Sequence, residues 1–242
     1  MLDFLGIGAR KAATTWVFKR LSMHSETYFP LGKEVHYWNN LEKKSGDTYK
    51  KIFRNSKFSA ANGFKCGEIT PDYALIDEHA IQKIYEFTPQ CKVFYIVRNP
   101  VDCIWSTLKH HFRLQGKDIK MAEESDLHQM VNDRLTKNHL DYASNILRWK
   151  KYFNDLCILD YSLIEKDPKY FLSLLCSHLE IDEDYYQFIP DKLIKEVIHT
   201  SKGGKIPHQL YKRIYSEVEP QITALEDLEG LNLSHWRKNE TA

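Results

Sequence analysis

The sequence lacks most features that mark specialised classes of protein. Its five cysteines are scattered and odd in number, so no CxxC pair or Cys/His spacing indicates a metal site or a disulfide framework. It contains no run of about 18 apolar residues and no charged segment followed by a short apolar one. Neither charge sign is in excess, because 34 basic residues face 33 acidic ones. This balance predicts no nucleic-acid partner and no integral membrane segment.

What the sequence does contain fits one globular domain spanning residues 1–242. Hydrophobic residues make up 43% of the chain, enough for a core that needs no disulfide or metal. Most of the cysteines lie in apolar stretches, where a free thiol acts as a small core residue. This pattern favours a reducing compartment and therefore a cytoplasmic protein. The alternative is a catalytic domain excised from a longer protein of the secretory pathway.

Apolar runs that predict strands alternate with segments of helical spacing. Strands are expected at residues 2–7, 33–38, 64–67, 91–97 and 156–160. Helices are expected at residues 14–23, 71–87, 101–111, 139–153, 167–178 and 207–228, and residues 116–126 are polar and irregular. The alternation predicts an α/β fold with a central parallel sheet and helices on both faces. Such sheets bind ligands beyond the carboxyl ends of their strands.

The loop after the first predicted strand has the chemistry of a phosphate site. Small residues let the backbone approach a ligand, and the following helix directs its N–H groups and its dipole toward an anion. Cationic and hydroxyl side chains add further donors. The contributing residues are Arg10, Lys11, Ala12, Ala13, Thr14 and Thr15. The site is P-loop-like, although the order of a Walker A loop is absent. A plain strand–turn–helix connection is the alternative.

Two further segments carry residues suited to phosphate. Arg98 follows the strand at 91–97, and Ser106 lies eight residues later on the next predicted helix. Together they can clamp one phosphate from two directions. Alternatively, Arg98 pairs with Asp102 and Ser106 faces solvent. Near the end of the chain, a flexible cationic loop that could close over a nucleotide consists of Lys202, Gly203, Gly204 and Lys205. Its alternative is a solvated linker.

Read together, these segments resemble the sulfotransferases that use 3′-phosphoadenosine 5′-phosphosulfate (PAPS). GARKAATTW at 8–16 resembles the family's 5′-phosphosulfate loop, VRNPVDCIWS at 97–106 its 3′-phosphate motif, and TSKGGK at 200–205 its late nucleotide loop. GKEVHYW at 32–38 and EITPDY at 68–73 resemble the EVHFF and EKTPAY segments of the heparan sulfate 3-O- and N-sulfotransferases. The DP pair at 167–168 also matches the family's helix start. The ordered set spans nearly the whole chain.

The sequence departs from the family pattern at three points. Ala12 and Ala13 stand where glycines are common, which requires that neither residue adopts a positive φ. Ile69 replaces the lysine of EKTPAY, and Asn39 replaces the aspartate that follows EVHFF in the 3-O enzymes. The last two departures bear on the acceptor rather than on the chemistry.

The resemblance implies PAPS as sulfuryl donor and no metal. It implies that Glu34 is the general base, that Lys11 stabilises charge on the leaving phosphate, and that Trp16 stacks on adenine. His36 either orients Glu34 or binds the acceptor. Glu34 could instead be a surface carboxylate paired with Lys33 or Lys65.

Aromatic residues around Glu34 and the low net charge predict a neutral or weakly acidic carbohydrate hydroxyl as acceptor, with a lipid or small-molecule alcohol as the rival. Two other functions remain open from the residues alone. A nucleotide-binding kinase would need a Walker lysine and Mg²⁺ carboxylates, and Arg98 stands where such an Asp would follow the strand. A non-catalytic PAP-binding module would lack turnover.

Overall fold

The computed structural model describes residues 1–43, 47–54, 63–196, 198, 204 and 206–237. The chain divides into two compact units. The first comprises Met1–Val97 and Ile146–Ile198, and the second comprises Arg98–Asn145 and His199–Ala242. The first unit holds the β-sheet, and the described part of the second is helical. The expected organisation as one domain over 1–242 stays a prediction.

The first unit is built on a five-stranded sheet in the order β2-β3-β1-β4-β5. All the paired strands run parallel, and Gly6 of β1 lies between Ile69 of β3 and Phe94 of β4. The strands are β1 (Phe4–Gly6), β2 (Thr27–Tyr28), β3 (Lys65–Ile69), β4 (Lys92–Val97) and β5 (Cys157–Asp160). This arrangement confirms the predicted α/β fold with a central parallel sheet.

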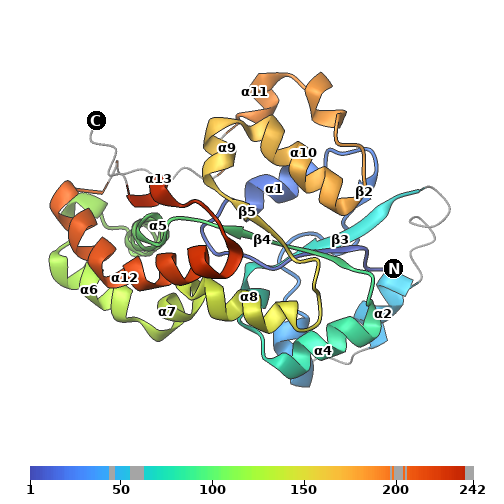
Figure 1. Ribbon diagram of the computed structural model, residues 1–242, viewed down its shortest axis with the longest axis horizontal. Coiled ribbons are helices and arrows are strands. Elements are labelled where there is room, and N and C mark those ends of the chain that lie inside the picture. The colour runs from blue at the N-terminus through green and yellow to red at the C-terminus, as the bar shows by residue number, and fades with distance from the viewer. Residues whose placement is uncertain (44–46, 55–62, 197, 199–203, 205, 238–242) are drawn as a thin grey trace. The chain divides into compact units, whose positions relative to one another are not determined.

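Helices cover both faces of this sheet. Figure 1 shows α1 (Thr14–Leu21) and α10 (Pro168–Leu179) on one face and α4 (Glu78–Phe87) on the other. The remaining α-helices of this unit are α2 (Asp47–Arg54), α9 (Ser162–Lys166) and α11 (Asp191–Ile194), with α8 (Tyr142–Lys150) spanning the boundary between the units. The 3₁₀ helices are η1 (Trp38–Lys43), η2 (Pro71–Leu75) and η4 (Tyr185–Phe188).

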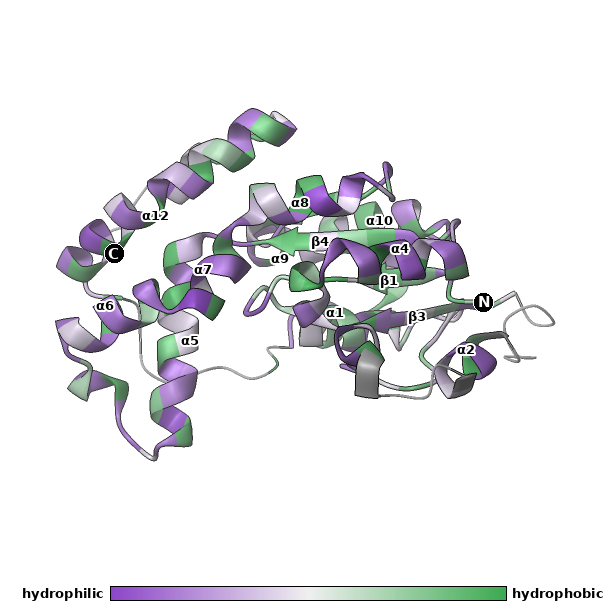
Figure 2. Cartoon of the chain, turned by 90° about the horizontal axis from the view of Figure 1, so that it is seen from below, coloured by the Kyte–Doolittle hydropathy of each residue, from purple (hydrophilic) through white to green (hydrophobic). Residues whose placement is uncertain are grey.

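The burial of β4 follows directly from its sequence. Residues 93–97 are at most 1% exposed, as expected for a strand covered on both faces. Figure 2 shows β4 as hydrophobic along its length, whereas α12 (His208–Glu229) mixes hydrophobic and hydrophilic residues. β4 therefore lies in the core of the sheet without the polar alternation of a strand that faces water on one side.

The second unit consists of helices organised around the start of α5 (Pro100–Leu114). Asn99 caps α5 by accepting from the Val101 N–H at 3.0 Å. Its amide donates to the Tyr211 hydroxyl at 3.1 Å and to the Trp236 carbonyl at 3.0 Å. These bonds join α5 to α12 and to α13 (Ser234–Arg237). The other described helices of this unit are η3 (Ile119–Met121), α6 (Glu124–Asn132) and α7 (Arg134–Leu140).

Four sequence-based predictions of secondary structure need correction. Residues 33–37 form a loop and not a strand, and Trp38 begins η1. The helix expected at 71–87 is interrupted because Asp77 caps a new helix through the Ala80 N–H. The helix expected at 139–153 is interrupted at Asp141, whose carboxylate accepts from the Ser144 N–H. The segment 116–126, expected to be irregular, contains η3 and the start of α6.

The strand order places the functional loops at one edge of the sheet. From central β1 the chain crosses to β3 on one side and later to β4 on the other, which makes the carboxyl end of β1 a topological switch point. Residues 8–13 follow β1 at this edge, and residues 70–73 follow β3. Parallel pairing brings these two segments together.

The close packing of β1 against β3 predicts a severe effect for Gly67→Ala. A Cβ on Gly67 would lie 2.0–2.4 Å from ring atoms of Phe4, which is itself 1% exposed and enclosed. We expect a loss of about 3 kcal/mol in the free energy of unfolding, at the upper end for overpacking. Gly116→Ala is the control, since nothing lies within 4 Å and only its φ of +69° opposes the methyl group. Gly116→Ala should lower the free energy of unfolding by about 1 kcal/mol, as measured by urea titration. Equal losses for the two variants would contradict the packing argument.

Candidate active site

The loop after β1 begins as a continuation of the sheet. The Ala9 N–H donates to the Ile96 carbonyl at 2.7 Å, and the Ile96 N–H donates to the Gly8 carbonyl at 2.9 Å. Gly8 has a φ of +153°, and a Cβ there would lie 2.8 Å from the Tyr95 ring. Only glycine fits this position, because a side chain would meet both the backbone constraint and the ring. The loop is therefore held closely against β4 where it starts.

The rest of the loop has the backbone form of an anion-binding concavity. Lys11 and Ala13 have φ values of 62° and 56°, whereas Ala12 between them does not have a positive φ. Alternation in the sign of φ is a feature of nests, in which successive N–H groups converge on an anion. Ala13 is also the N-cap of α1 and provides no side-chain hydrogen bond to the helix. The first N–H groups of α1 therefore add to the donors available for an anion.

The positive φ of Ala13 contradicts the requirement derived from the sequence. An alanine in the left-handed region costs about 1 kcal/mol relative to glycine. Ala12, by contrast, meets the requirement, and its methyl group is fully buried. One of the two alanines thus occupies a position that suits glycine.

The side chains at the start of α1 differ in exposure. Thr14 is buried, with 6% of its surface exposed, and Thr15 is half-buried. Trp16 is also 6% exposed, and its indole Nε1–H donates to the Ile194 carbonyl at 3.0 Å. Its ring contacts the edge of Phe171 and the Arg20 guanidinium. These are the packing contacts of a core tryptophan, and stacking on adenine stays a prediction.

The segment 33–38 carries the predicted general base in an unusual backbone conformation. Glu34 and His36 have φ values of 61° and 54°. The Glu34 N–H donates to the Ile69 carbonyl at 3.1 Å, so the segment is attached to the end of β3 by a single ladder-like bond. Alternation of polar and aromatic residues resembles a strand, but two left-handed residues exclude an extended ladder.

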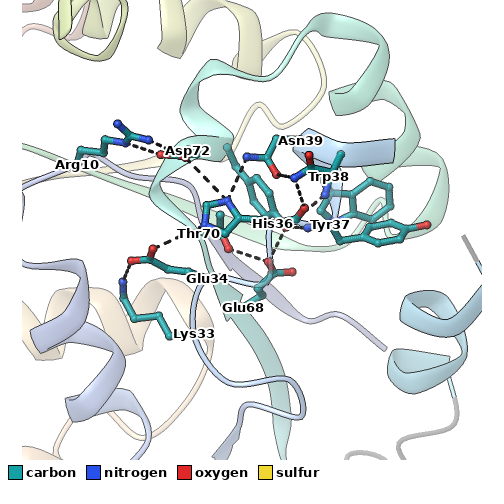
Figure 3. A network of polar contacts seen from close by, with 12 residues as sticks. Arg10, Lys33, Glu34, His36, Tyr37, Trp38, Asn39, Glu68, Thr70 and Asp72 are labelled. Carbon is teal, nitrogen blue, oxygen red and sulfur yellow. Dashed lines mark hydrogen bonds and ion pairs between the residues drawn. The ribbon is translucent and has the colours of Figure 1, made fainter. Parts of the chain in front are cut away.

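The side chains of Glu34 and His36 face each other (Figure 3). His36 Nε2 lies 3.7 Å from Glu34 Oε2, and the Asn39 amide lies 3.1 Å from His36 Nδ1. Nε2 of His36 therefore faces the carboxylate of Glu34, and Nδ1 faces Asn39. Lys33 donates to the other oxygen of Glu34. The Glu34 side chain is 45% exposed and therefore accessible to a substrate.

The predicted alternative for Glu34, pairing with Lys33, is present in the structure. Lys65 pairs instead with Glu180 at 3.5 Å. An ion pair with a neighbouring lysine does not prevent a carboxylate from accepting a proton, since such pairs are weak when exposed. The contacts of Glu34 are therefore compatible with both readings.

A buried carboxyl group lies behind this loop and was not singled out by the sequence reasoning. Glu68 on β3 is 0% exposed. Thr70 Oγ1 and the Tyr73 hydroxyl donate to Oε1 at 2.8 and 2.6 Å, and the Tyr49 hydroxyl donates to Oε2. Burial raises the pKa of Glu68, while the three donors act in the opposite direction. A charged residue inside a strand that otherwise reads as buried was the available signal.

The segment after β3 also binds the phosphate loop. Asp72 on η2 accepts two hydrogen bonds from Arg10, with Nε–Oδ1 at 2.5 Å and Nη2–Oδ2 at 2.8 Å. Asp72 Oδ2 lies 3.9 Å from His36 Nδ1. Figure 3 shows Asp72 between Arg10 and His36. The segment 68–73 therefore contacts both the loop after β1 and the loop that carries Glu34.

Ile69, which replaces the family's lysine, has a side chain that is 0% exposed. It lies in the interior beside Gly6, where a Cβ would come within 3.0 Å of Ile69 Cγ1. The apolar side chain is thus part of the sheet core, and a lysine at this position would require a different local packing.

The second unit contains the residues predicted to bind the 3′-phosphate. Arg98 and Ser106 are half-buried, and the Tyr142 hydroxyl donates to the Arg98 carbonyl at 2.8 Å. Trp105 Nε1–H donates to the Gly204 carbonyl at 3.1 Å, so Gly204 lies beside the residue preceding Ser106. Lys202, Gly203 and Lys205 lie outside the described residues.

Three charged groups interact at α5 and at the residue before its cap. Burial lowers the pKa of Lys109, and the nearby positive charge of Arg98 acts in the same direction. Burial raises the pKa of Asp102, although Arg98 and Lys109 oppose that rise. Arg98, which precedes α5, therefore interacts with one carboxylate and one cation of this helix.

Two searches of the described residues concern metals and membranes. No group of three or more His, Cys, Asp or Glu side chains within them could hold a metal ion. Among the described helices none has the length and apolar character required to cross a membrane.

Comparison with known proteins places these observations in context. The family model described as a sulfotransferase domain matches residues 2–203. The structure of a sulfotransferase from Alicyclobacillus acidocaldarius is similar with a TM-score of 0.74 at 20% identity, covering 98% of this chain and 99% of the other. The sulfotransferase domain from the curacin biosynthetic pathway gives 0.55 at 17% identity, covering 93% and 98%. A mouse sulfotransferase complexed with PAP gives 0.50 at 12% identity, covering 98% and 88%. No curated protein is significantly similar in sequence.

The positive φ at Ala13 predicts opposite effects for two neighbouring substitutions. Ala13→Gly should leave stability unchanged or raise it by up to about 1 kcal/mol, because relief of the left-handed strain offsets the added freedom of the unfolded chain. Ala12→Gly should lower the free energy of unfolding by about 1 kcal/mol, because the unfolded chain gains conformational freedom and the folded protein loses a buried methyl group. Urea denaturation of both variants measures the difference. Equal destabilisation would contradict the conformation of the loop.

Proposed function

The chain belongs to the sulfotransferase family, and on this premise we propose that its sulfuryl donor is PAPS and its acceptor is a carbohydrate hydroxyl group. The observation that carries the donor assignment is the loop at 8–13. Its alternating φ values and uncapped helix start provide N–H donors for a phosphosulfate group. Arg98, Ser106 and the loop that includes Gly204 would bind the 3′-phosphate. An amine is the alternative acceptor group, and it would receive the sulfuryl group from the same donor.

The reaction requires positioning and charge stabilisation more than covalent help from the protein. The acceptor oxygen attacks sulfur in line, an O–S bond forms, and the bond from sulfur to the bridging phosphate oxygen breaks. Glu34 takes the acceptor's proton. Lys11 and the loop N–H groups stabilise the negative charge that develops on the departing nucleotide. His36, whose Nε2 lies 3.7 Å from Glu34 Oε2, would keep the carboxylate in orientation.

The competing functions predict different measurements. A kinase-like enzyme would transfer phosphate from ATP with Mg²⁺, and a non-catalytic module would bind PAP without turnover. Membership of the sulfotransferase family supports sulfuryl transfer over both. Turnover of PAPS without added metal would support the sulfotransferase. Phosphate transfer from ATP with Mg²⁺ would support the kinase-like enzyme, and binding of PAP without turnover would support the non-catalytic module.

The acceptor proposal rests on the charges near Glu34 and on the resemblance of the segments around Glu34 and Tyr73 to glycan enzymes. The ionic groups there are mixed, with Lys33 and Arg10 paired to Glu34 and Asp72. A heavily sulfated chain would require an excess of cations. Aromatic residues give less support than the sequence suggested, because Tyr37, Trp38 and Tyr73 are buried, whereas Tyr28 is exposed.

The proposed 3′-phosphate site predicts a strong preference among nucleotides. PAP should raise the melting temperature well above the shift given by AMP or ATP, with about 2.7 kcal/mol of stabilisation at a concentration 100 times its Kd. Arg98→Ala should remove most of the difference between PAP and AMP. Arg113→Ala, an exposed position on α5, the helix that follows Arg98, is the control and should keep this difference. Equal shifts with PAP and AMP for the unmodified protein would exclude the 3′-phosphate assignment.

Binding and chemistry should separate when Glu34 and Lys11 are changed. Glu34→Gln should keep nucleotide affinity and lose turnover by about 100-fold, the effect of removing a general base. Lys11→Ala should weaken both, because it acts on bound PAPS and on the leaving phosphate. Glu86→Gln, an exposed glutamate on α4, is the control for Glu34→Gln. Normal turnover by Glu34→Gln would move the role of base elsewhere, with His36 tested first.

A radiolabelled-PAPS assay over neutral oligosaccharides, heparan-type chains and simple alcohols tests the acceptor. We expect label in the neutral or weakly acidic oligosaccharides, in agreement with the mixed charges near Glu34. Label confined to heparan-type chains would refute the charge argument. Label confined to phenols or alkyl alcohols would refute the assignment to a sugar.

A further inference from the structure

The carboxyl group of Glu68 is enclosed and fully occupied by donors. It is 0% exposed, and its two oxygens accept hydrogen bonds from Thr70, Tyr73 and Tyr49. A buried carboxylate is costly unless such donors surround it, and a well-packed apolar group often replaces a buried ionic one without loss of stability. Fold stability alone therefore does not account for this arrangement. Glu68 also cannot act as the base, because no substrate atom can reach it.

The hydroxyl of Tyr73 links Glu68 by hydrogen bonds to the loop that carries Glu34 and His36. It donates to Glu68 Oε1 at 2.6 Å and accepts from the N–H groups of Tyr37 at 2.9 Å and Trp38 at 3.3 Å. One phenol oxygen therefore joins the buried carboxyl group to two consecutive backbone amides.

Tyr49 on α2 supports the same loop from the other side. Its hydroxyl donates to Glu68 and accepts from the Trp38 indole N–H at 3.1 Å. Its ring stacks on that of Tyr37, with centroids 4.2 Å apart and planes 6° from parallel. The side chains and the backbone of residues 37–38 are thus both fixed by partners of one carboxyl group.

The loop needs such support because of its conformation. Glu34 and His36 both lie in the left-handed region, which non-glycine residues occupy only where surrounding contacts enforce it. The bond from the Glu34 N–H to Ile69 fixes the loop before His36, and the bonds to Tyr73 fix it after His36. His36 therefore lies between two anchors, both supplied by residues 69–73.

We propose that Glu68, acting through Tyr73, is a positioning residue for the transfer reaction: it holds the loop 34–38 so that Glu34 and His36 face the acceptor in a fixed orientation. The inference rests on the proposed role of Glu34 as base. It assigns no direct contact with substrate to either Glu68 or Tyr73.

The first test measures the anchor without any activity assay. Tyr73→Phe removes the shared hydroxyl, and amide hydrogen exchange of Tyr37 and Trp38 should accelerate about fivefold or more, the effect of losing one hydrogen bond. Tyr186→Phe is the matched control: this tyrosine is 1% exposed and donates to the Arg20 carbonyl at 2.8 Å, away from the loop. It should leave both amides unchanged. Unchanged exchange in Tyr73→Phe would overturn the proposal.

The second test measures the consequence for catalysis. Tyr73→Phe should lower kcat about 10- to 100-fold with the KM for PAPS within about twofold, as expected when a reacting group is misplaced by a fraction of an ångström. Tyr186→Phe should keep kcat even where its melting temperature falls. Glu68→Gln, which retains an oxygen that accepts from Tyr73, should keep more activity than the apolar Glu68→Met. Faster exchange with unchanged kcat, or full activity of Glu68→Met, would overturn the positioning role.

Failure of the proposed function gives a different pattern. If the unmodified protein and Tyr186→Phe both fail to turn over PAPS with every acceptor class, the proposed function and the catalytic role of the loop are refuted together. Accelerated exchange in Tyr73→Phe would then still establish the anchor. If the unmodified protein is active and Glu34→Gln is equally active, the loop does not carry the base, and the positioning of Glu34 is refuted alone.

Discussion

The candidate active site in the first unit depends on one short segment, residues 68–73, at the carboxyl end of β3. Its constraint is electrostatic: the carboxyl group of Glu68 is enclosed, so hydroxyl groups must be placed around it. Tyr73 meets this need and thereby fixes the backbone of residues 37–38. Asp72, one residue earlier, binds Arg10 of the phosphate loop. One hexapeptide thus fixes two loops that lie far apart in the sequence.

The loop at residues 8–13 depends on backbone conformation more than on side chains. Gly8 lets the chain pass close to Tyr95, and the sign of φ alternates at residues 11–13, as it does in anion-binding nests. Ala13 achieves in a strained form what glycine would adopt freely. This strain is maintained because sheet bonds hold the start of the loop and α1 holds its end, which is the usual condition for strained residues at functional sites.

The acceptor side of the site is shaped by burial as much as by exposed chemistry. Aromatic residues gather there, but Tyr37 and Trp38 pack with Tyr49 and serve as the support of the loop. The exposed groups near Glu34 are ionic and balanced in sign. The loop that carries Glu34 therefore combines a small set of exposed charged side chains with a supporting aromatic core.

The sequence alone determined the α/β fold, because the apolar run of β4 and the helical spacing around it depend on local periodicity. Its residue types also predicted a phosphate site in the loop after β1, which stays a prediction. It also located α10, since Pro168 and the Asp167 cap are local signals. The tertiary structure alone decided the form of residues 33–38. Their alternation is that of a strand, but the N–H groups of Glu34 and Tyr37 donate to Ile69 and Tyr73, more than 30 residues away, and the backbone is left-handed at Glu34 and His36. It likewise revealed Glu68, because the three hydroxyls that allow a carboxyl group to be buried come from separate segments, and only folding brings them together.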